Sequence, residues 1–274
     1  LKTAYMDGTA PHTADTHMAA VDSAYIDLGA YYDYEAISDC KNELKQLYGG
    51  CAARYKKAYS VFAAAGAVQN GWQDEFSTQS EKEEAVKRVS GIALREFGKR
   101  HREKGLIKRR FLSALTYNGL SSLPETSAAL CNRFYVFENR LRMAAPALNF
   151  LCEAASEAGH EVIACLNPLT PEKIEAVLLP SLSLGFITDE CALNSGLDAR
   201  RIRLDALADV ERLKKTRAEL RRCEKLTEAL VSEGCSNLHE AKLMHDEIER
   251  IFNPNVDFDG IGALAQKHLK ALGI

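Results

Sequence analysis

Residues 134–188, FYVFENRLRMAAPALNFLCEAASEAGHEVIACLNPLTPEKIEAVLLPSLSLGFIT, contain the pattern that decides the fold. Short apolar runs alternate with helical spans, in the order strand, helix, strand, helix, strand. The expected strands are residues 134–137, 161–165 and 182–188, and the expected helices are residues 143–158 and 171–178. This alternation is typical of βαβ units that form a parallel sheet. We therefore predict an α/β fold with this stretch at its centre.

The loop after the first of these strands is residues 138–146, ENRLRMAAP. In a parallel sheet this loop normally binds the phosphate of a nucleotide. Here it contains no glycine and no Gly-Lys-Ser/Thr, and Pro146 removes one N–H donor. Asn139, Arg140 and Arg142 are the candidate nucleotide-binding residues, because they could supply polar groups and charge. They do not rebuild the phosphate cradle, so we expect this site to be inactive.

Composition restricts the classes of partner. Hydrophobic residues make up 46% of the 274-residue chain and charged residues 27%, with a net charge of −3. This net charge offers no general attraction to nucleic acid or to acidic membranes. The chain has no apolar run near the roughly 20 residues that cross a bilayer. The eight cysteines include no C-x-x-C pair, which favours reduced thiols in the cytoplasm. We predict a cytoplasmic protein without membrane or nucleic acid partners.

The first seven residues, LKTAYMD, read as a short apolar strand that ends in the carboxylate of Asp7. A Walker B element needs such a strand, because its Asp holds Mg²⁺ against the phosphates of a nucleotide. The alternative is that Asp7 only opens an Asp-Gly turn. Thr9 and His12 follow closely and could sense the γ-phosphate or the substrate. The strand begins without any lead-in, so we expect the chain to be a fragment of a longer protein.

Amphipathic stretches outside the centre predict long helices. Helices are expected at residues 33–66 and 72–102, as a hairpin around a bend at 66–71, and at residues 206–231, 237–252 and 261–272. A basic cluster at residues 99–110 lies where the hairpin ends. The cluster could contact phosphates, although the helix dipole alone also explains cations at a C-terminal helix end.

The two halves of the chain resemble each other in the order of their elements. The aligned strands are residues 1–7 with 182–188, and the short Ile-x-Leu strands 26–28 with 202–204. We therefore predict two related repeats, the first incomplete, in domains spanning residues 1–105 and 106–274. Asp7 aligns with Thr188, so the second repeat lacks the Walker B carboxylate unless Asp189 substitutes for it.

Several short motifs together resemble a known family, the bacterial two-repeat P-loop ATPases. They are Tyr5-Met-Asp-Gly-Thr-Ala-Pro-His12, Ile26-Asp-Leu-Gly29, Phe134-Tyr-Val136, Gly159-His-Glu-Val162 and Pro171-Glu-Lys-Ile-Glu175. The resemblance implies a P-loop NTPase-like parallel sheet with long helical-hairpin insertions, and ATP and Mg²⁺ as cofactors. It also implies a Gly-rich Walker A loop in each repeat. The first loop would precede Leu1, and the second is replaced by residues 138–146.

The function that this resemblance implies is ATP binding with Mg²⁺-dependent hydrolysis in the first repeat. Asp7 would be the metal ligand and, with Thr9 and His12, would form the catalytic group, while the second repeat is inactive. We expect this chain alone to be an inactive hydrolase. Two alternatives stay open: a scaffold that binds a protein partner through the long helices, and a kinase that acts on a small molecule or a nucleotide.

Overall fold

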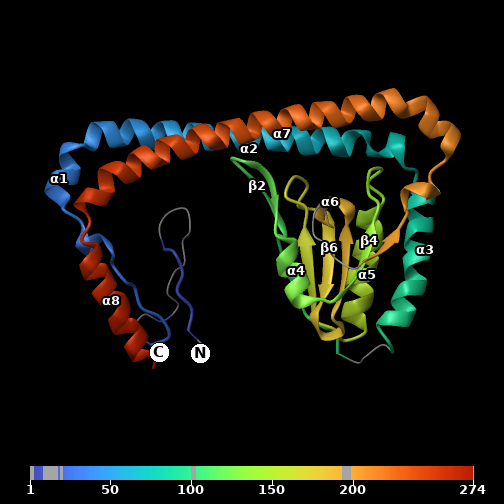
Figure 1. Ribbon diagram of the computed structural model, residues 1–274, viewed down its shortest axis with the longest axis horizontal. Coiled ribbons are helices and arrows are strands. Elements are labelled where there is room, and N and C mark those ends of the chain that lie inside the picture. The colour runs from blue at the N-terminus through green and yellow to red at the C-terminus, as the bar shows by residue number, and fades with distance from the viewer. Residues whose placement is uncertain (1–2, 9–17, 19–20, 100–102, 193–198, 274) are drawn as a thin grey trace. The chain divides into compact units, whose positions relative to one another are not determined.

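The computed structural model describes residues 3–8, 18, 21–99, 103–192 and 199–273 (Figure 1). The chain divides into two compact units. One unit, called the sheet unit here, is Ala52–Lys242. The other, called the terminal unit, combines Leu1–Cys51 with Leu243–Ile274. The boundaries of these units differ from the boundary expected from the sequence between residues 105 and 106.

A six-stranded, mostly parallel sheet is the centre of the sheet unit (Figure 1). Its strands, in spatial order, are β1 (Ile107–Arg110), β5 (Val162–Leu166), β6 (Ile174–Leu179), β7 (Leu184–Thr188), β4 (Arg133–Phe137) and β8 (Ala199–Ile202). The pairs β1–β5, β7–β4 and β4–β8 are parallel, whereas β6 runs antiparallel to both of its neighbours. The predicted α/β class is confirmed, and so are the three strands expected near residues 134, 161 and 182.

The prediction of a helix over residues 171–178 is wrong, because β6 lies there. The run Ile-Glu-Ala-Val-Leu-Leu is almost wholly buried between β5 and β7. A short apolar run of this kind cannot be assigned to a strand or a buried helix by periodicity alone. Only the 3₁₀ turn Pro180–Leu182 and one further residue separate β6 from β7, and such a short connection forces the two strands to be antiparallel.

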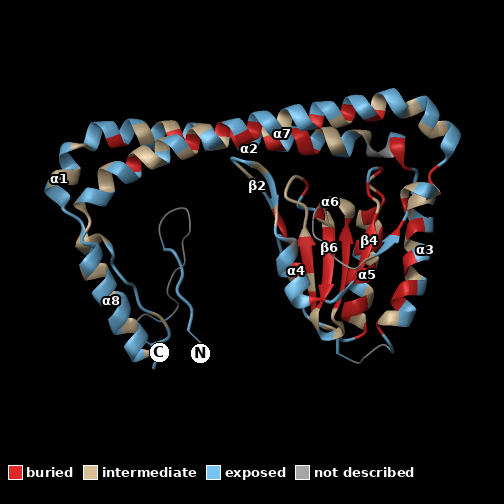
Figure 2. Cartoon of the chain, in the orientation of Figure 1, coloured by how far each residue is buried: buried red, intermediate tan, exposed pale blue. Residues whose placement is uncertain are grey.

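Helices cover the sheet and bury its aromatic residues (Figure 2). Helix α5 (Ala144–Glu157), predicted over residues 143–158, packs against α3 (Gln79–Glu96) and against the sheet. In the core between them Phe186 stacks on Tyr135 and on Phe137, with ring centroids 5.3 and 6.2 Å apart. A smaller apolar cluster that includes Phe134 and Ile187 lies apart from this core. The unit also contains two short helices, α4 (Pro124–Leu130) and α6 (Asp189–Ala192), and a hairpin formed by β2 (Ser113–Thr116) and β3 (Gly119–Ser122).

Two helices are longer than predicted: α2 (Lys41–Phe76) and α7 (Val210–Phe252). The expected bend at residues 66–71 is wrong, because α2 continues through it and the chain breaks only before α3. The break expected between residues 231 and 237 is also wrong. There α7 packs on α2, and a Cβ on Gly234 would lie 2.3 Å from the ring of Phe62. Gly234 therefore permits a close approach of two helices. In the sequence alone, a glycine at this position has the appearance of a helix end.

The terminal unit consists of helices and loops in its described part. It contains η1 (Gly29–Tyr31), α1 (Tyr34–Asp39), η4 (Asn253–Asn255) and α8 (Phe258–Ala271), together with the adjoining ends of α2 and α7. Helix α8 confirms the helix expected at residues 261–272. The strands expected at residues 1–7 and 26–28 are wrong for the described residues, which form no strand there and have no sheet to join. Among the described helices, none combines the length and the apolar character that a bilayer crossing requires.

Candidate functional site

The candidate site is a cleft of about 310 Å³ in the sheet unit, beside the carboxyl ends of the neighbouring strands β4 and β7. Parallel sheets most often place their ligands at this edge. The cleft is lined by Arg140 and Arg142 after β4, by Asp189 and Glu190 after β7, and by residues of α2 and α7: Gln69, Phe76, Leu220, Cys223, Glu224, Thr227 and Glu228. Two of the three candidate nucleotide-binding residues therefore line one cleft.

The loop between β4 and α5 is held by a carboxylate from elsewhere in the chain. Asp205, from the 3₁₀ turn η3 (Asp205–Leu207), accepts hydrogen bonds from the backbone N–H groups of Arg140 and Leu141, each at 3.2 Å. Asn139, the third candidate, is buried, and its side-chain oxygen accepts from the N–H of Ala144 at 3.0 Å. Three backbone donors between β4 and the first residue of α5, where a P-loop would meet a phosphate, are thus already bonded inside the protein.

Asp205 occupies an unfavourable electrostatic position. Burial raises the pKa of its carboxyl above the ordinary value, and the nearby charges of Asp189 and Glu138 add to that rise. The hydrogen bonds from Leu141 and Arg140 oppose it. The two backbone amides therefore compensate the carboxylate for lost hydration, much as they would compensate a bound anion.

The two arginines of the loop are paired with glutamates at the cleft. Arg140 donates through Nε and Nη2 to the carboxylate of Glu224, at 2.7 and 3.1 Å. Arg142 donates through Nη1 to Glu190 at 2.9 Å. Arg142 also has a positive φ of 59°, so it makes the left-handed turn that glycine makes in a P-loop. A phosphate group entering here would compete with glutamates for both guanidinium groups.

Sequence reasoning missed a buried carboxyl next to this cleft. Glu175, on β6, accepts hydrogen bonds from Ser113 Oγ at 2.5 Å and from Asn167 Nδ2 at 3.0 Å. Burial raises the pKa of Glu175 above its ordinary value. A small pocket of about 20 Å³ is lined by Glu175 together with Asn139 and Arg142. A single acid within the apolar run Ile-Glu-Ala-Val-Leu-Leu was the available signal for it.

The predicted catalytic residues belong to a different part of the chain. Asp7 is an exposed residue of the terminal unit and follows no strand among the described residues. Thr9 and His12 lie outside the described residues. The structure therefore places Arg140 and Arg142 at one cleft of the sheet unit and Asp7 in the other compact unit.

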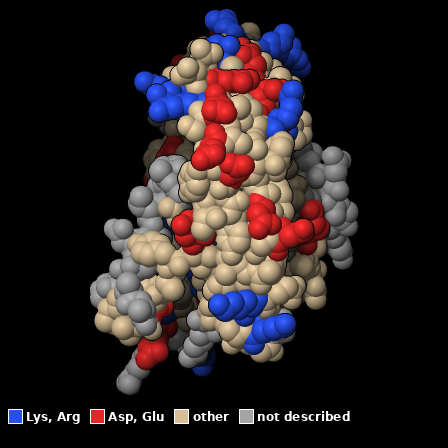
Figure 3. Space-filling view, turned by 90° about the vertical axis from the view of Figure 1, so that its left-hand side faces the viewer, with Lys and Arg blue, Asp and Glu red and all other residues tan. Residues whose placement is uncertain are grey.

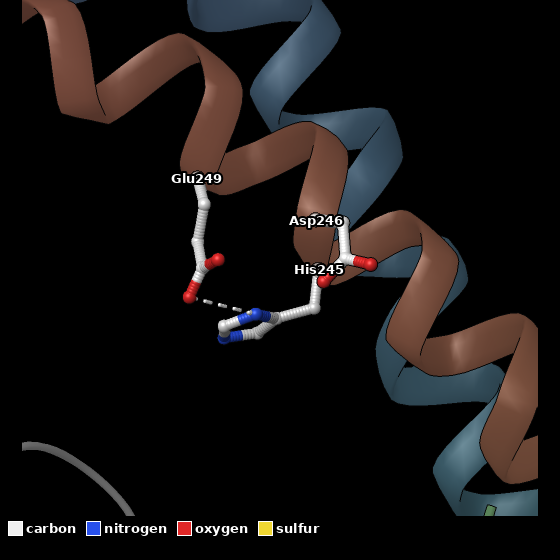
Figure 4. A group of neighbouring side chains, drawn as sticks. All are labelled: His245, Asp246 and Glu249. Atoms are coloured by element: carbon white, nitrogen blue, oxygen red, sulfur yellow. Dashed lines mark ion pairs between the residues drawn. The ribbon is translucent and has the colours of Figure 1, made fainter.

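His245, Asp246 and Glu249 form a small group on α7 in the terminal unit (Figure 4). Their candidate ligand atoms lie within 4.8 Å of one another, and His245 Nδ1 is 3.5 Å from Glu249 Oε1. All three residues come from one stretch of a single helix, where positions three and four apart are neighbours in any sequence. Three exposed side chains on one helix, with no further ligand from another element among the described residues, do not define a metal centre.

Comparisons of the chain with protein-family models, with curated proteins and with solved structures found no match. The functional argument therefore rests on the residues and the geometry of this chain.

Proposed function

We propose that this chain is a P-loop NTPase-like protein whose sheet unit is a catalytically inactive repeat, while ATP binding depends on Asp7. The observation that carries the proposal is the pair of hydrogen bonds from the backbone of Arg140 and Leu141 to Asp205. In this arrangement the chain supplies its own anion to the loop between β4 and α5. An internal carboxylate at that place is what a decayed phosphate site would contain.

The surrounding topology supports the same proposal. β4 leads through the loop into α5, and the neighbouring parallel strand β7 ends immediately before Asp189, which lines the cleft. P-loop proteins use this relation, with a Walker B carboxylate that holds Mg²⁺ against the phosphates. In the proposal Asp189 is therefore the remnant of a metal ligand in a site that has lost its phosphate cradle.

The energetics explain why a triphosphate would bind poorly at this loop. A hydrogen bond to a charged group stabilises by about 1.5–3 kcal/mol, and a phosphate would have to displace both amide bonds of Asp205. It would also have to displace Glu190 and Glu224 from the two arginines. The loop has no Lys to reach a γ-phosphate and no Ser or Thr hydroxyl to hold Mg²⁺.

Under the proposal, the nucleotide site that remains includes Asp7 as the Mg²⁺ ligand, with Thr9 and His12 nearby. This assignment comes from the sequence resemblance. Magnesium in such a site would neutralise charge on the phosphates. Asp7 would hold the metal at the position where that charge lies.

Calorimetric titration of the full-length natural protein with Mg-ATP tests the proposal. We expect Arg142→Ala to leave the affinity unchanged, because the loop does not hold ATP, and Asp7→Asn to abolish Mg²⁺-dependent binding. Asp205→Ala frees the two loop amides, so we expect it to add weak anion binding that the wild type lacks. A tenfold loss of Mg-ATP affinity in Arg142→Ala would overturn the assignment of an inactive site. A wild-type protein that binds no Mg-ATP would instead favour a scaffold role.

A further inference from the structure

Charge is distributed unequally between the two units. The terminal unit contains 13 Asp and Glu against 6 Lys and Arg, which is a net charge of −7. The sheet unit contains 25 Asp and Glu against 29 Lys and Arg, which is a net charge of +4. Figure 3 shows Asp and Glu side chains gathered over the middle of one face of the molecule. The overall charge of −3 therefore conceals a basic unit.

One group of exposed cations of the sheet unit lies on the first half of α7. A cationic surface, called the α7 basic face here, consists of six exposed side chains: Lys214, Lys215, Arg217, Arg221, Arg222 and Lys225. At a rise of 1.5 Å per residue these positions span roughly 16 Å of helix. The buried residues Leu220, Cys223 and Thr227 mark the opposite side of the helix.

Of the glutamates in this segment, one forms an ion pair with the α7 basic face. Glu224 turns toward the cleft and pairs with Arg140. Glu219 is half-buried, and its carboxylate oxygen Oε2 is buried without a hydrogen-bond partner among the described residues. Glu211 pairs with Lys214 at 2.8 Å. The other five cations have no ion pair with any residue in the described part of the chain.

The chemistry of this surface identifies the class of partner. Val210 and Leu226, at the two ends of this segment, are exposed, but between them α7 exposes no other large apolar side chain. Protein–protein interfaces have apolar centres with few charges, and exposed ion pairs contribute only about 0–1 kcal/mol each. A helix face with cations at its centre and apolar side chains only at its ends is therefore poorly suited to a protein partner. Phosphodiesters suit it, because each neutralised phosphate releases condensed counterions.

The same residues favour a duplex over a single strand. Proteins that bind single strands stack the bases on aromatic side chains. The segment 210–225, VERLKKTRAELRRCEK, contains no Phe, Tyr or Trp. We propose that the α7 basic face binds the phosphodiester backbone of a nucleic acid duplex without reading its sequence.

The proposal is tested on the full chain by fluorescence anisotropy of a labelled 25-base-pair DNA duplex of mixed sequence. A duplex of about 25 base pairs is several times longer than the α7 basic face. The test variant is Arg217→Gln with Arg221→Gln and Lys225→Gln, because glutamine keeps the helix propensity. Its matched control is Lys56→Gln with Arg88→Gln and Arg95→Gln, which removes three other exposed cations of the sheet unit. Thermal unfolding by circular dichroism checks that both variants fold.

We expect the test variant to bind the duplex at least about tenfold more weakly than the control. We also expect the slope of log affinity against log salt to become shallower by about one for each lost phosphate contact. Equal affinity of the wild-type protein for duplex DNA and duplex RNA supports recognition of the shared backbone. A strong preference for one of them would overturn recognition of the backbone alone.

Three outcomes overturn the proposal directly. The first is a wild-type protein that does not bind the duplex at low salt. The second is an equal loss of affinity in the test variant and the control, which would reflect net charge and not this face. The third is binding to vesicles of anionic phospholipid in the absence of any binding to the duplex, which would assign the face to a membrane surface.

Discussion

Glu175 is a buried carboxyl that the fold has to accommodate. Burial raises its pKa, and the hydrogen bonds from Ser113 and Asn167 only partly compensate. The raised pKa means that the folded protein binds the carboxyl proton of Glu175 more tightly than the unfolded chain does. The free energy of unfolding therefore falls as the pH rises from the pKa of Glu175 in the unfolded chain through its pKa in the folded protein. Above the folded pKa the full penalty is present.

We predict that Glu175→Gln removes this pH dependence. The amide keeps the shape of the carboxyl and cannot ionise. The free energy of unfolding of the variant, relative to wild type, should therefore rise as the pH increases from the ordinary Glu pKa of about 4.3 through the raised pKa of the folded protein. Urea unfolding across that range measures the difference. Glu125→Gln, at an exposed position, serves as the control. Parallel pH profiles for wild type and Glu175→Gln would contradict the burial argument.

Under the proposed function, Arg142 and Asp205 take the places of a phosphate-binding motif. The left-handed backbone of Arg142 makes the turn that a glycine would make, and Asp205 bonds the amides that a phosphate would bond. Neither residue type suggests this role by itself. Their functions follow from the positions in which β4 and η3 hold them.

At the scale of elements, one capping box joins the starts of two helices. Thr78 accepts from the N–H of Glu81, and Glu81 accepts from the N–H of Thr78, at 3.3 and 2.8 Å. Glu81 also accepts from Arg212, near the start of α7. Burial pushes the pKa of Glu81 up, but these hydrogen bonds and the charge of Arg212 hold that pKa below its ordinary value.

We predict that Thr78→Ala lowers the free energy of unfolding by about 1 kcal/mol, because an unsatisfied N–H then begins α3. Ser80→Ala is the matched control: it also removes a hydroxyl, at an exposed position two residues further on that has no capping bond. Chemical denaturation measures both variants. If the two substitutions destabilise equally, the capping box does not contribute as proposed.

At the scale of the whole molecule, the two units bury very different amounts of apolar surface. Nearly all of the buried apolar residues belong to the sheet unit. In the described part of the terminal unit the buried apolar residues are Leu44, Cys51 and Ile248. Because burial of apolar area is the main stabilising term in folding, the terminal unit should open at a much lower free energy.

Hydrogen exchange followed by mass spectrometry measures this difference. We predict that peptides from α1 and α8 exchange several orders of magnitude faster than peptides from β4 and β7, since an opening free energy lower by 1.4 kcal/mol already gives a factor of about ten. Exchange of the same peptides in denaturant supplies the reference rates. Equal protection of α8 and β7 would show that the terminal unit is stabilised by contacts beyond its own core.

Part of this organisation could be predicted from sequence. The strands β4, β5 and β7 and the helices α5 and α8 were found because each carries its own local pattern of apolar residues. For the site, the sequence correctly indicated that the loop after β4 has no phosphate-binding glycines. It did not indicate the partners of that loop, because Asp205, Glu190 and Glu224 come from elements 48 to 84 residues away.

The sequence by itself determined the α/β class and the positions of the elements with strong local periodicity. The tertiary structure alone decided that residues 174–179 form a strand, that α7 continues through Gly234, and that Asp205 fills the loop after β4. The physical reason is the same in all three cases. Each depends on what a distant part of the chain places beside the residue: two flanking strands, the ring of Phe62, and a pair of backbone amides. Burial and hydrogen bonding between distant residues leave little trace in local periodicity.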